Sequence, residues 1–173
     1  MDAIKLLESH HKKAKAALKK LSHGHDAKTL ETLASELAAH MVIEETIFYP
    51  AVRRVKPDLI MESYEEHAIA QLALKRLIAT QARDARFKAR AKALFDLIDH
   101  HVEEEEGELF PKVKKSVDDE TLESLGRKMK ERFEELVDQG YEAVLPTGAG
   151  KVTADRASER ASSTNGHAEA RHG

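Results

Sequence analysis

The chain has 173 residues, 41% of them hydrophobic, and a formal net charge of −3 at pH 7, so it is long enough for one domain with an apolar core. Acidic and basic residues are interspersed without a basic face, which argues against a nucleic-acid partner. No apolar run approaches the roughly 20 residues that a membrane span needs. There is no cysteine, which excludes disulfides and thiolate metal sites. With no basic and apolar leader at its start, we expect a cytoplasmic protein.

Apolar residues recur three and four positions apart along most of the chain, which is the spacing of one helical face. Asp26 and Asp84 are candidate N-caps, and Pro57 separates two helices because proline fits the first turn of a helix and disfavours helix in the residue before it. Pro50 and Pro111 are expected to end or kink their helices. The pattern predicts long helices over about 3–21, 26–55, 58–81 and 84–117.

A fifth amphipathic segment is predicted over about 119–144, and we expect it to pack across the other four helices. Its apolar stripe consists of Leu122, Leu125, Met129, Phe133 and Leu136. The residues after it, 147–173, contain almost no apolar anchor, so they cannot bury enough surface to offset the cost of ordering. We therefore expect a bundle domain over 1–146 and a disordered tail over 147–173.

The sequence repeats itself in two places. Segment 40–50, HMVIEETIFYP, resembles segment 101–111, HVEEEEGELFP, and segment 11–21 resembles 67–77 in its histidine and leucine positions. The first two helices therefore form one hairpin and the next two a second, related hairpin. Two such hairpins facing each other predict an all-α fold, an antiparallel up-and-down four-helix bundle.

Each of the four predicted helices carries a histidine where a core residue is expected, and two of them carry a glutamate one turn later. A carboxylate in an apolar core costs several kcal/mol unless it is paired or bound to a metal, and imidazole with carboxylate suits iron, zinc or manganese. One such histidine is more often a satisfied core residue, but six residues in register favour a metal site. The candidate ligands are His11, His40, Glu44, His67, His101 and Glu105.

This order of motifs, a histidine, then His-x-x-x-Glu, then a histidine, then His-x-x-x-Glu, resembles the hemerythrin HHE cation-binding family. The resemblance covers about residues 2–145 and includes LLESHH, EETIFYP, EEGELFP and ESLGRKMKERFEEL. It implies a hemerythrin-like bundle with two iron ions per chain, in which the four histidines are terminal ligands. Glu44 and Glu105 would bridge the irons together with an oxo or hydroxo group.

The resemblance further implies a non-haem di-iron protein that binds or processes a small diatomic or peroxide ligand, namely O₂, nitric oxide or H₂O₂. Oxygen binding, redox sensing and detoxification all fit this expectation. The alternative is an iron- or oxygen-responsive regulatory module without turnover. No residue beyond the ligands is a committed acid or base, so the sequence does not decide whether the protein is an enzyme. A monomer or weak homo-oligomer is expected.

Three ligand positions have neighbours that compete for the role. His11 is preferred to His10 because the family often has an acidic residue directly before the ligand histidine, and the apolar face and the internal repeat agree with this choice. His101 is preferred to His100 because His100 shares a face with Asp96 and Glu103 and is expected to face solvent. Glu105 is preferred to Glu106 because of the repeat, although the oxygen carriers of the family use the spacing that selects the later residue.

Two further residues lie on the face of His67. Gln71 stands where the oxygen carriers place a fifth histidine, so we expect a site with four histidines and two glutamates. This favours redox chemistry or sensing, unless a water replaces the missing ligand and oxygen binding is retained. Tyr64, one turn before His67, is interpreted as a packing residue with its hydroxyl satisfied, with a hydrogen-bond donor close to the metals or a metal ligand as the alternatives.

Overall fold

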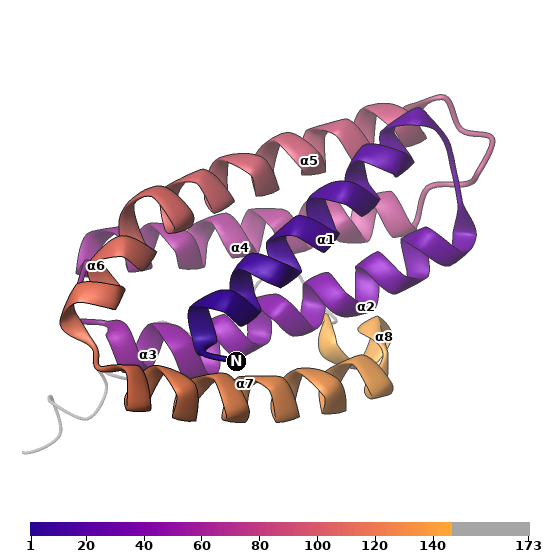
Figure 1. Cartoon of the computed structure of the whole chain (residues 1–173). Coiled ribbons are helices and arrows are strands. Elements are labelled where there is room, and N and C mark those ends of the chain that lie inside the picture. Colours follow the sequence, from indigo (N-terminus) through magenta and orange to yellow (C-terminus); the bar gives the residue numbers. More distant parts are fainter. Residues whose placement is uncertain (147–173) are drawn as a thin grey trace, which may run out of the picture.

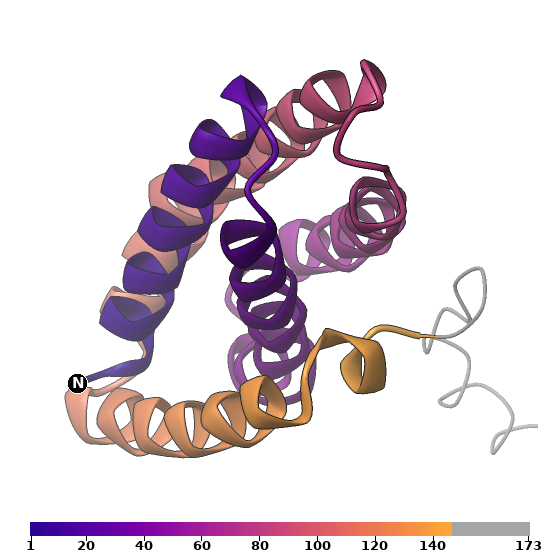
Figure 2. The same ribbon diagram turned by 90° about the vertical axis from the view of Figure 1, so that its right-hand side faces the viewer.

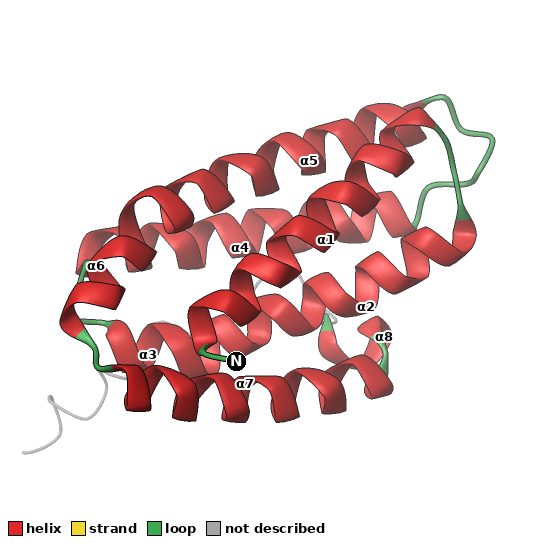
Figure 3. Cartoon of the chain, viewed as in Figure 1, coloured by secondary structure: helices red, strands yellow, loops and turns green. Residues whose placement is uncertain are grey.

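A computed structural model describes residues 1–146 of the chain as an all-helical bundle without a β-strand in that range (Figure 3). Four long helices run alternately up and down, and α1 packs against both α2 and α5, while α4 packs against α5 (Figure 1). The predicted antiparallel four-helix bundle is therefore confirmed. The long helices are α1 (Ala3–His23), α2 (Ala27–Ile43), α4 (Pro57–Ile78) and α5 (Arg86–Glu104).

Two of the long helices continue through a single wide turn into a short helix. The π-helical segments η1 (Glu44–Phe48) and η2 (Glu105–Leu109) follow α2 and α5 directly, and they lead into α3 (Tyr49–Val52) and α6 (Phe110–Ser116). Pro50 and Pro111 were expected to end or kink their helices. Each lies in the first turn of the short helix that follows the π turn, a position that proline occupies readily.

Aspartates begin three of the helices. The side chains of Asp2, Asp26 and Asp118 each accept a hydrogen bond from the backbone N–H three residues later, which satisfies one of the free donors of the first turn. Asp26 is the cap that the sequence predicts. Asp84 is not the N-cap of α5: Ala85 occupies that position, and Asp84 accepts from the backbone N–H of Arg86 at 2.9 Å.

The fifth helix, α7 (Asp119–Gln139), crosses one side of the bundle and packs on α1 and α2, and the short α8 (Tyr141–Val144) packs on α2 (Figure 2). Where α7 meets the start of the chain, Gly126 lies so close that a Cβ atom there would come within 2.5 Å of the carbonyl oxygen of Met1 and 2.8 Å of the amide nitrogen of Ala3. The glycine thus permits the close approach of these two segments.

The core consists of two apolar clusters. One joins the start of α1 to η1, α3, η2, α6 and α7, and the other joins the remainder of α1 and α2 to α4 and α5. Along α1 and α4, the histidine proposed as a ligand lies between residues of the first cluster and residues of the second, whereas His101 on α5 lies among residues of the second cluster, one turn before η2, which belongs to the first. A polar layer therefore separates the two halves of the core.

No helix in residues 1–146 is long and apolar enough to cross a membrane. The segment 147–173, for which the sequence predicts disorder, lies outside the residues that the structure describes.

Replacing Gly126 with alanine should lower the stability of the bundle even though alanine favours helix, because the added methyl group clashes with backbone atoms that cannot rotate away. The expected loss is about 1–3 kcal/mol of unfolding free energy, measured by urea denaturation. Gly24→Ala is the matched control, since nothing lies within 4 Å of a Cβ at that position. Equal stability of the two variants would show that the close approach is not a constraint.

Candidate metal centre

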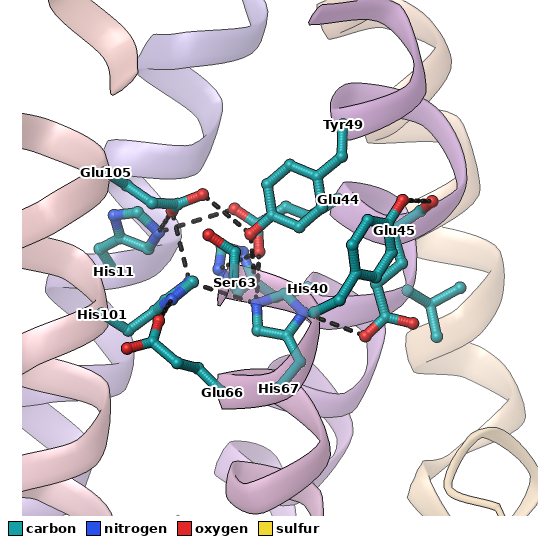
Figure 4. A network of polar contacts seen from close by, with 12 residues as sticks. His11, His40, Glu44, Glu45, Tyr49, Ser63, Glu66, His67, His101 and Glu105 are labelled. Carbon is teal, nitrogen blue, oxygen red and sulfur yellow. Dashed lines mark hydrogen bonds and ion pairs between the residues drawn. The ribbon is translucent and has the colours of Figure 1, made fainter. Parts of the chain in front are cut away.

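All six predicted ligands meet in the middle of the bundle, and none is more than 5% exposed (Figure 4). Each long helix contributes one histidine, and the two glutamates are the first residues of the two π turns. The six are His11 from α1, His40 from α2, Glu44 from η1, His67 from α4, His101 from α5 and Glu105 from η2.

Glu44 lies at the centre of this group. Its Oε2 atom is 3.1 Å from Nε2 of His40 and 3.4 Å from Nε2 of His67, and its Oε1 atom is 3.8 Å from Nε2 of His11. One carboxylate is therefore shared by histidines from three different helices, which is the arrangement that a bridging ligand needs.

Glu105 approaches the same centre from the opposite hairpin. Its Oε2 atom lies 3.3 Å from Nε2 of His11 and 3.5 Å from Nε2 of His101. The Nε2 atoms of His67 and His101 are themselves only 3.2 Å apart. Four imidazole nitrogens and two carboxylates thus converge on one small volume.

Four of the buried donor atoms in this volume lack hydrogen-bond partners among the described residues. Both oxygens of Glu44, Oε2 of Glu105 and Nε2 of His11 are inaccessible to solvent and unpaired. Buried polar atoms are almost always satisfied, and a bound cation would satisfy these. Three groups of candidate ligands have atoms within 4.8 Å of one another, and two of them are fully buried at the centre: His11 with His40 and Glu44, and Glu44 with His67 and His101. The third, Glu66 with His100 and Glu104, is partly exposed, and Glu105 belongs to none of the three. The residues therefore fit two cations that share Glu44.

The outward-facing nitrogens of three of the histidines contact a carboxylate. Nδ1 of His11 lies 2.9 Å from Glu106, Nδ1 of His67 lies 3.0 Å from Glu45, and Nδ1 of His101 lies 2.7 Å from Glu66. Such a contact fixes the proton on Nδ1, leaves Nε2 free for a metal, and orients the ring.

The contacts of these carboxylates with the histidines were not predicted from the sequence. A charged residue next to a buried one is usually assigned to the solvent-exposed face of its helix, and Glu106 was considered only as an alternative metal ligand to Glu105. Glu45 and Glu106 each follow a central glutamate and occupy equivalent places in the repeat, so the repeat itself was the available signal.

The internal repeat is broken at two positions beside the centre. Tyr49 and Phe110 are equivalent, but only Tyr49 has a hydroxyl, and that hydroxyl donates to Oε1 of Glu105 at 2.9 Å and lies 3.4 Å from Nε2 of His67. Phe110 instead stacks parallel to His11, with ring centroids 5.9 Å apart. Tyr49 was missed because an aromatic in an apolar run reads as a core residue.

The second break lies at His10, whose equivalent is Glu66. His10 is buried against α7, where its ring stacks on Phe133 with centroids 4.0 Å apart. Burial lowers the pKa of His10 to about 4. His10 thus packs in the second layer, as the choice of His11 in the sequence implies.

The π turns explain why Glu105 and Glu106 could not be separated by helical spacing. In each turn the hydrogen bond spans five residues, from the N–H of Phe110 to the carbonyl of Glu105 and from the N–H of Tyr49 to that of Glu44. One extra residue per turn lets two consecutive glutamates face the histidines. Glu105 is fully buried at the centre, while Glu106 reaches the outer side of His11.

In the metal-free centre, His11 and His67 are protonated, because nearby carboxylates raise their pKa values. Burial lowers the pKa of His67, but the contacts with Glu44 and Glu45 outweigh it and raise that pKa to about 9. Burial also opposes the charge on His11, and Glu105, Glu106 and Glu44 together raise its pKa well above the usual range. The pKa of Tyr49 is raised by burial and by the nearby carboxylates, so its hydroxyl remains a donor.

Other residues singled out in the sequence lie outside the centre. The side chain of His100 is 63% exposed, as the register predicts. Tyr64 donates a hydrogen bond to the backbone carbonyl of Glu45 at 3.0 Å, so it supports the π turn and does not reach the centre. Gln71 is half-buried on α4.

Comparison with known proteins agrees with this geometry. The family model of the hemerythrin HHE cation-binding domain matches residues 2–113. The chain therefore belongs to the hemerythrin HHE cation-binding domain family.

Two proteins are similar to this chain. The crystal structure of a hemerythrin HHE cation-binding domain-containing protein from Mycobacterium kansasii is 26% identical, with a TM-score of 0.70 over 88% of this chain and 96% of the other. A protein of Nostoc sp. called a DNA nickase is 25% identical over 135 residues. The match covers 75% of this chain but only 38% of the nickase.

Metal binding at neutral pH should release protons, because a cation requires neutral imidazoles and the metal-free centre keeps His11 and His67 protonated. Apparent affinity should therefore increase as the pH is raised from 6.5 towards about 9. Calorimetric titration in buffers of different ionisation enthalpy measures the release. Glu45→Gln should reduce it, since this change removes a contact that holds the proton on His67. Binding without proton release would contradict the assigned protonation.

Proposed function

We propose that the chain holds two iron ions on His11, His40, Glu44, His67, His101 and Glu105, and that this centre binds or processes a small oxidant such as O₂, nitric oxide or H₂O₂. The main support is Glu44: it is fully buried, neither oxygen has a hydrogen-bond partner among residues 1–146, and it belongs to both of the buried groups of candidate ligands.

The number and type of donors favour a pair of redox-active metals. Six donors exceed the four of a tetrahedral zinc site, and a mixed imidazole and carboxylate set suits iron or manganese. A di-iron centre, when bound, supplies the electrons that a small oxidant accepts. The family is defined by cation binding, so the identity of the metal is the part of the proposal that needs measurement.

The surrounding residues have separate tasks in this proposal. The carboxylates Glu45, Glu66 and Glu106 keep the protons of three histidines on Nδ1 and hold the rings in place. Phe48 and Phe110 are buried beside the centre and exclude water from it. Tyr49 donates to Glu105 and offers the one hydroxyl proton that reaches this carboxylate among the described residues.

The similar proteins do not extend this proposal to a reaction on DNA. The nickase activity belongs to a protein of which this chain spans 38%. The buried histidine and glutamate cluster is too deeply enclosed to reach a nucleic acid, and it suits a ligand of a few atoms.

Removing either central carboxylate should lower the metal content. Glu44→Ala is expected to reduce two irons per chain to one or none, since both of the buried groups share this residue, and Glu105→Ala should release at least one. Metal analysis of chelator-washed protein measures the ratio, and the visible spectrum after reduction and re-exposure to air reports the centre. Glu103→Ala, an exposed position on α5, is the control. Unchanged iron in both variants would refute the ligand assignment.

Replacing Tyr49 with phenylalanine should keep two metals per chain while opening space beside them, because only a hydroxyl is lost. We expect azide to bind at least several-fold more tightly to the loaded variant, followed by optical titration. Tyr64→Phe should leave azide affinity unchanged, since its hydroxyl contacts a backbone carbonyl outside the centre. Weaker azide binding in Tyr49→Phe would show that the hydroxyl assists the ligand and does not block it.

A further inference from the structure

The outer contacts of the four histidines are unequal. His11, His67 and His101 each have a carboxylate within 3.0 Å of Nδ1. His40, which is 5% exposed, has no hydrogen-bond partner for its buried Nδ1 among the described residues. The histidine that lies closest to the shared Glu44 is therefore the one whose outer nitrogen is unsatisfied.

The repeat shows why this contact is missing. Glu66 precedes His67 and contacts His101, so the equivalent residue for His40 is the one that precedes His11. That residue is His10. Its ring is 5.6 Å from the ring of His40 and nearly perpendicular to it, and its own buried Nδ1 is also without a partner among residues 1–146.

Both unsatisfied residues line the same cavity between α1, α2 and α7. The centre of a water molecule can occupy a volume of about 10 Å³ in this cavity. By the same measure, about this volume is needed to hold one buried water. Its lining also includes Glu36, one turn before His40 on α2, and Phe133, on which His10 stacks.

We propose that this cavity is a binding site for one water molecule that holds His40 in place for the metal. With Nε2 of His40 on a metal, Nδ1 carries the proton and donates to the water oxygen. The water donates its two hydrogens to Nδ1 of His10 and to the carboxylate of Glu36. A buried water makes about three hydrogen bonds on average, and this site offers three partners.

The proposal rests on the proposed metal centre, because it assigns His40 a metal on Nε2. It gives the fourth histidine the same kind of support as the other three, with a water inserted between imidazole and carboxylate. His10 and Glu36 are then positioning residues that act through the water, and α7 closes the cavity through Phe133. The expected size of the effect follows from second-layer contacts elsewhere, which change metal affinity by about 10–100-fold.

The test uses the full chain loaded with cobalt(II) and follows release of the metal into excess EDTA by its visible absorption. His10→Phe keeps the stacking on Phe133 but removes the acceptor, and Ala14→Leu fills the cavity from α1. Each should release cobalt about tenfold faster. Ala16→Leu, an exposed position on the same helix, should release it at the unsubstituted rate. His10→Glu, which introduces the carboxylate found at position 66, should restore slow release.

Circular dichroism of every variant separates faster release from loss of the fold. A crystal structure of the unsubstituted chain should show one density peak about 3 Å from Nδ1 of both histidines. A dry cavity, or unchanged release in folded His10→Phe and Ala14→Leu, would overturn the proposal. If the unsubstituted chain retains no cobalt, the metal centre itself is refuted, and the crystal structure alone then decides whether the water site exists.

Discussion

Two carboxylates without solvent contact, Glu44 and Glu105, impose the constraint on which the rest of this structure depends. Charge in a protein interior is tolerated only when it is paired and hydrogen-bonded or bound to a metal. The bundle meets this requirement by surrounding the two carboxylates with four imidazoles. Those imidazoles are in turn held by residues of a second layer. Much of the sequence between positions 10 and 110 can be understood as support for two negative charges in the core.

The sequence predicts the bundle and the members of its centre well because both depend on helical periodicity. A histidine on the apolar face of a predicted helix is easily recognised in the sequence. Four such histidines in register with two glutamates favour a metal site over ordinary core packing. The helix boundaries, the cap at Asp26 and the crossing helix follow from patterns of the same kind. The role of each ligand, the identity of the metal and the state of residues 147–173 remain predictions.

The features that the sequence did not predict are those that depart from the regular period. A π turn adds one residue to a helix, so spacing rules based on 3.6 residues per turn cannot show that Glu105 and Glu106 both face histidines. Phe48 and Tyr49 are adjacent aromatic residues in one apolar run, and nothing in the sequence shows that the hydroxyl of Tyr49 meets a carboxylate. The outer glutamates depend on contacts between helices that are distant in sequence, and helical periodicity carries no information about such contacts.

The near-symmetry of the two hairpins makes the exceptions informative. The repeat places equivalent residues around both halves of the centre. It is broken at two pairs of positions: Tyr49 corresponds to Phe110, and His10 corresponds to the acidic Glu66. Both breaks lie within one residue layer of the candidate ligands. Two cations in this centre would therefore have different environments, one beside a hydroxyl and the other beside an aromatic face. A difference in reactivity between two otherwise similar metals can originate from such a pair of substitutions.

The division of the apolar core into two clusters has a consequence for folding. Cooperative unfolding requires that the halves of a domain stabilise each other, and here a layer of imidazoles and carboxylates lies between them. Without a cation this layer contains buried polar atoms that have no hydrogen-bond partner among the described residues, so it adds little apolar contact between the two clusters. Cations held by residues from all four long helices would link these helices at the centre of the bundle. Metal loading would then determine whether the bundle melts as one unit or from one end.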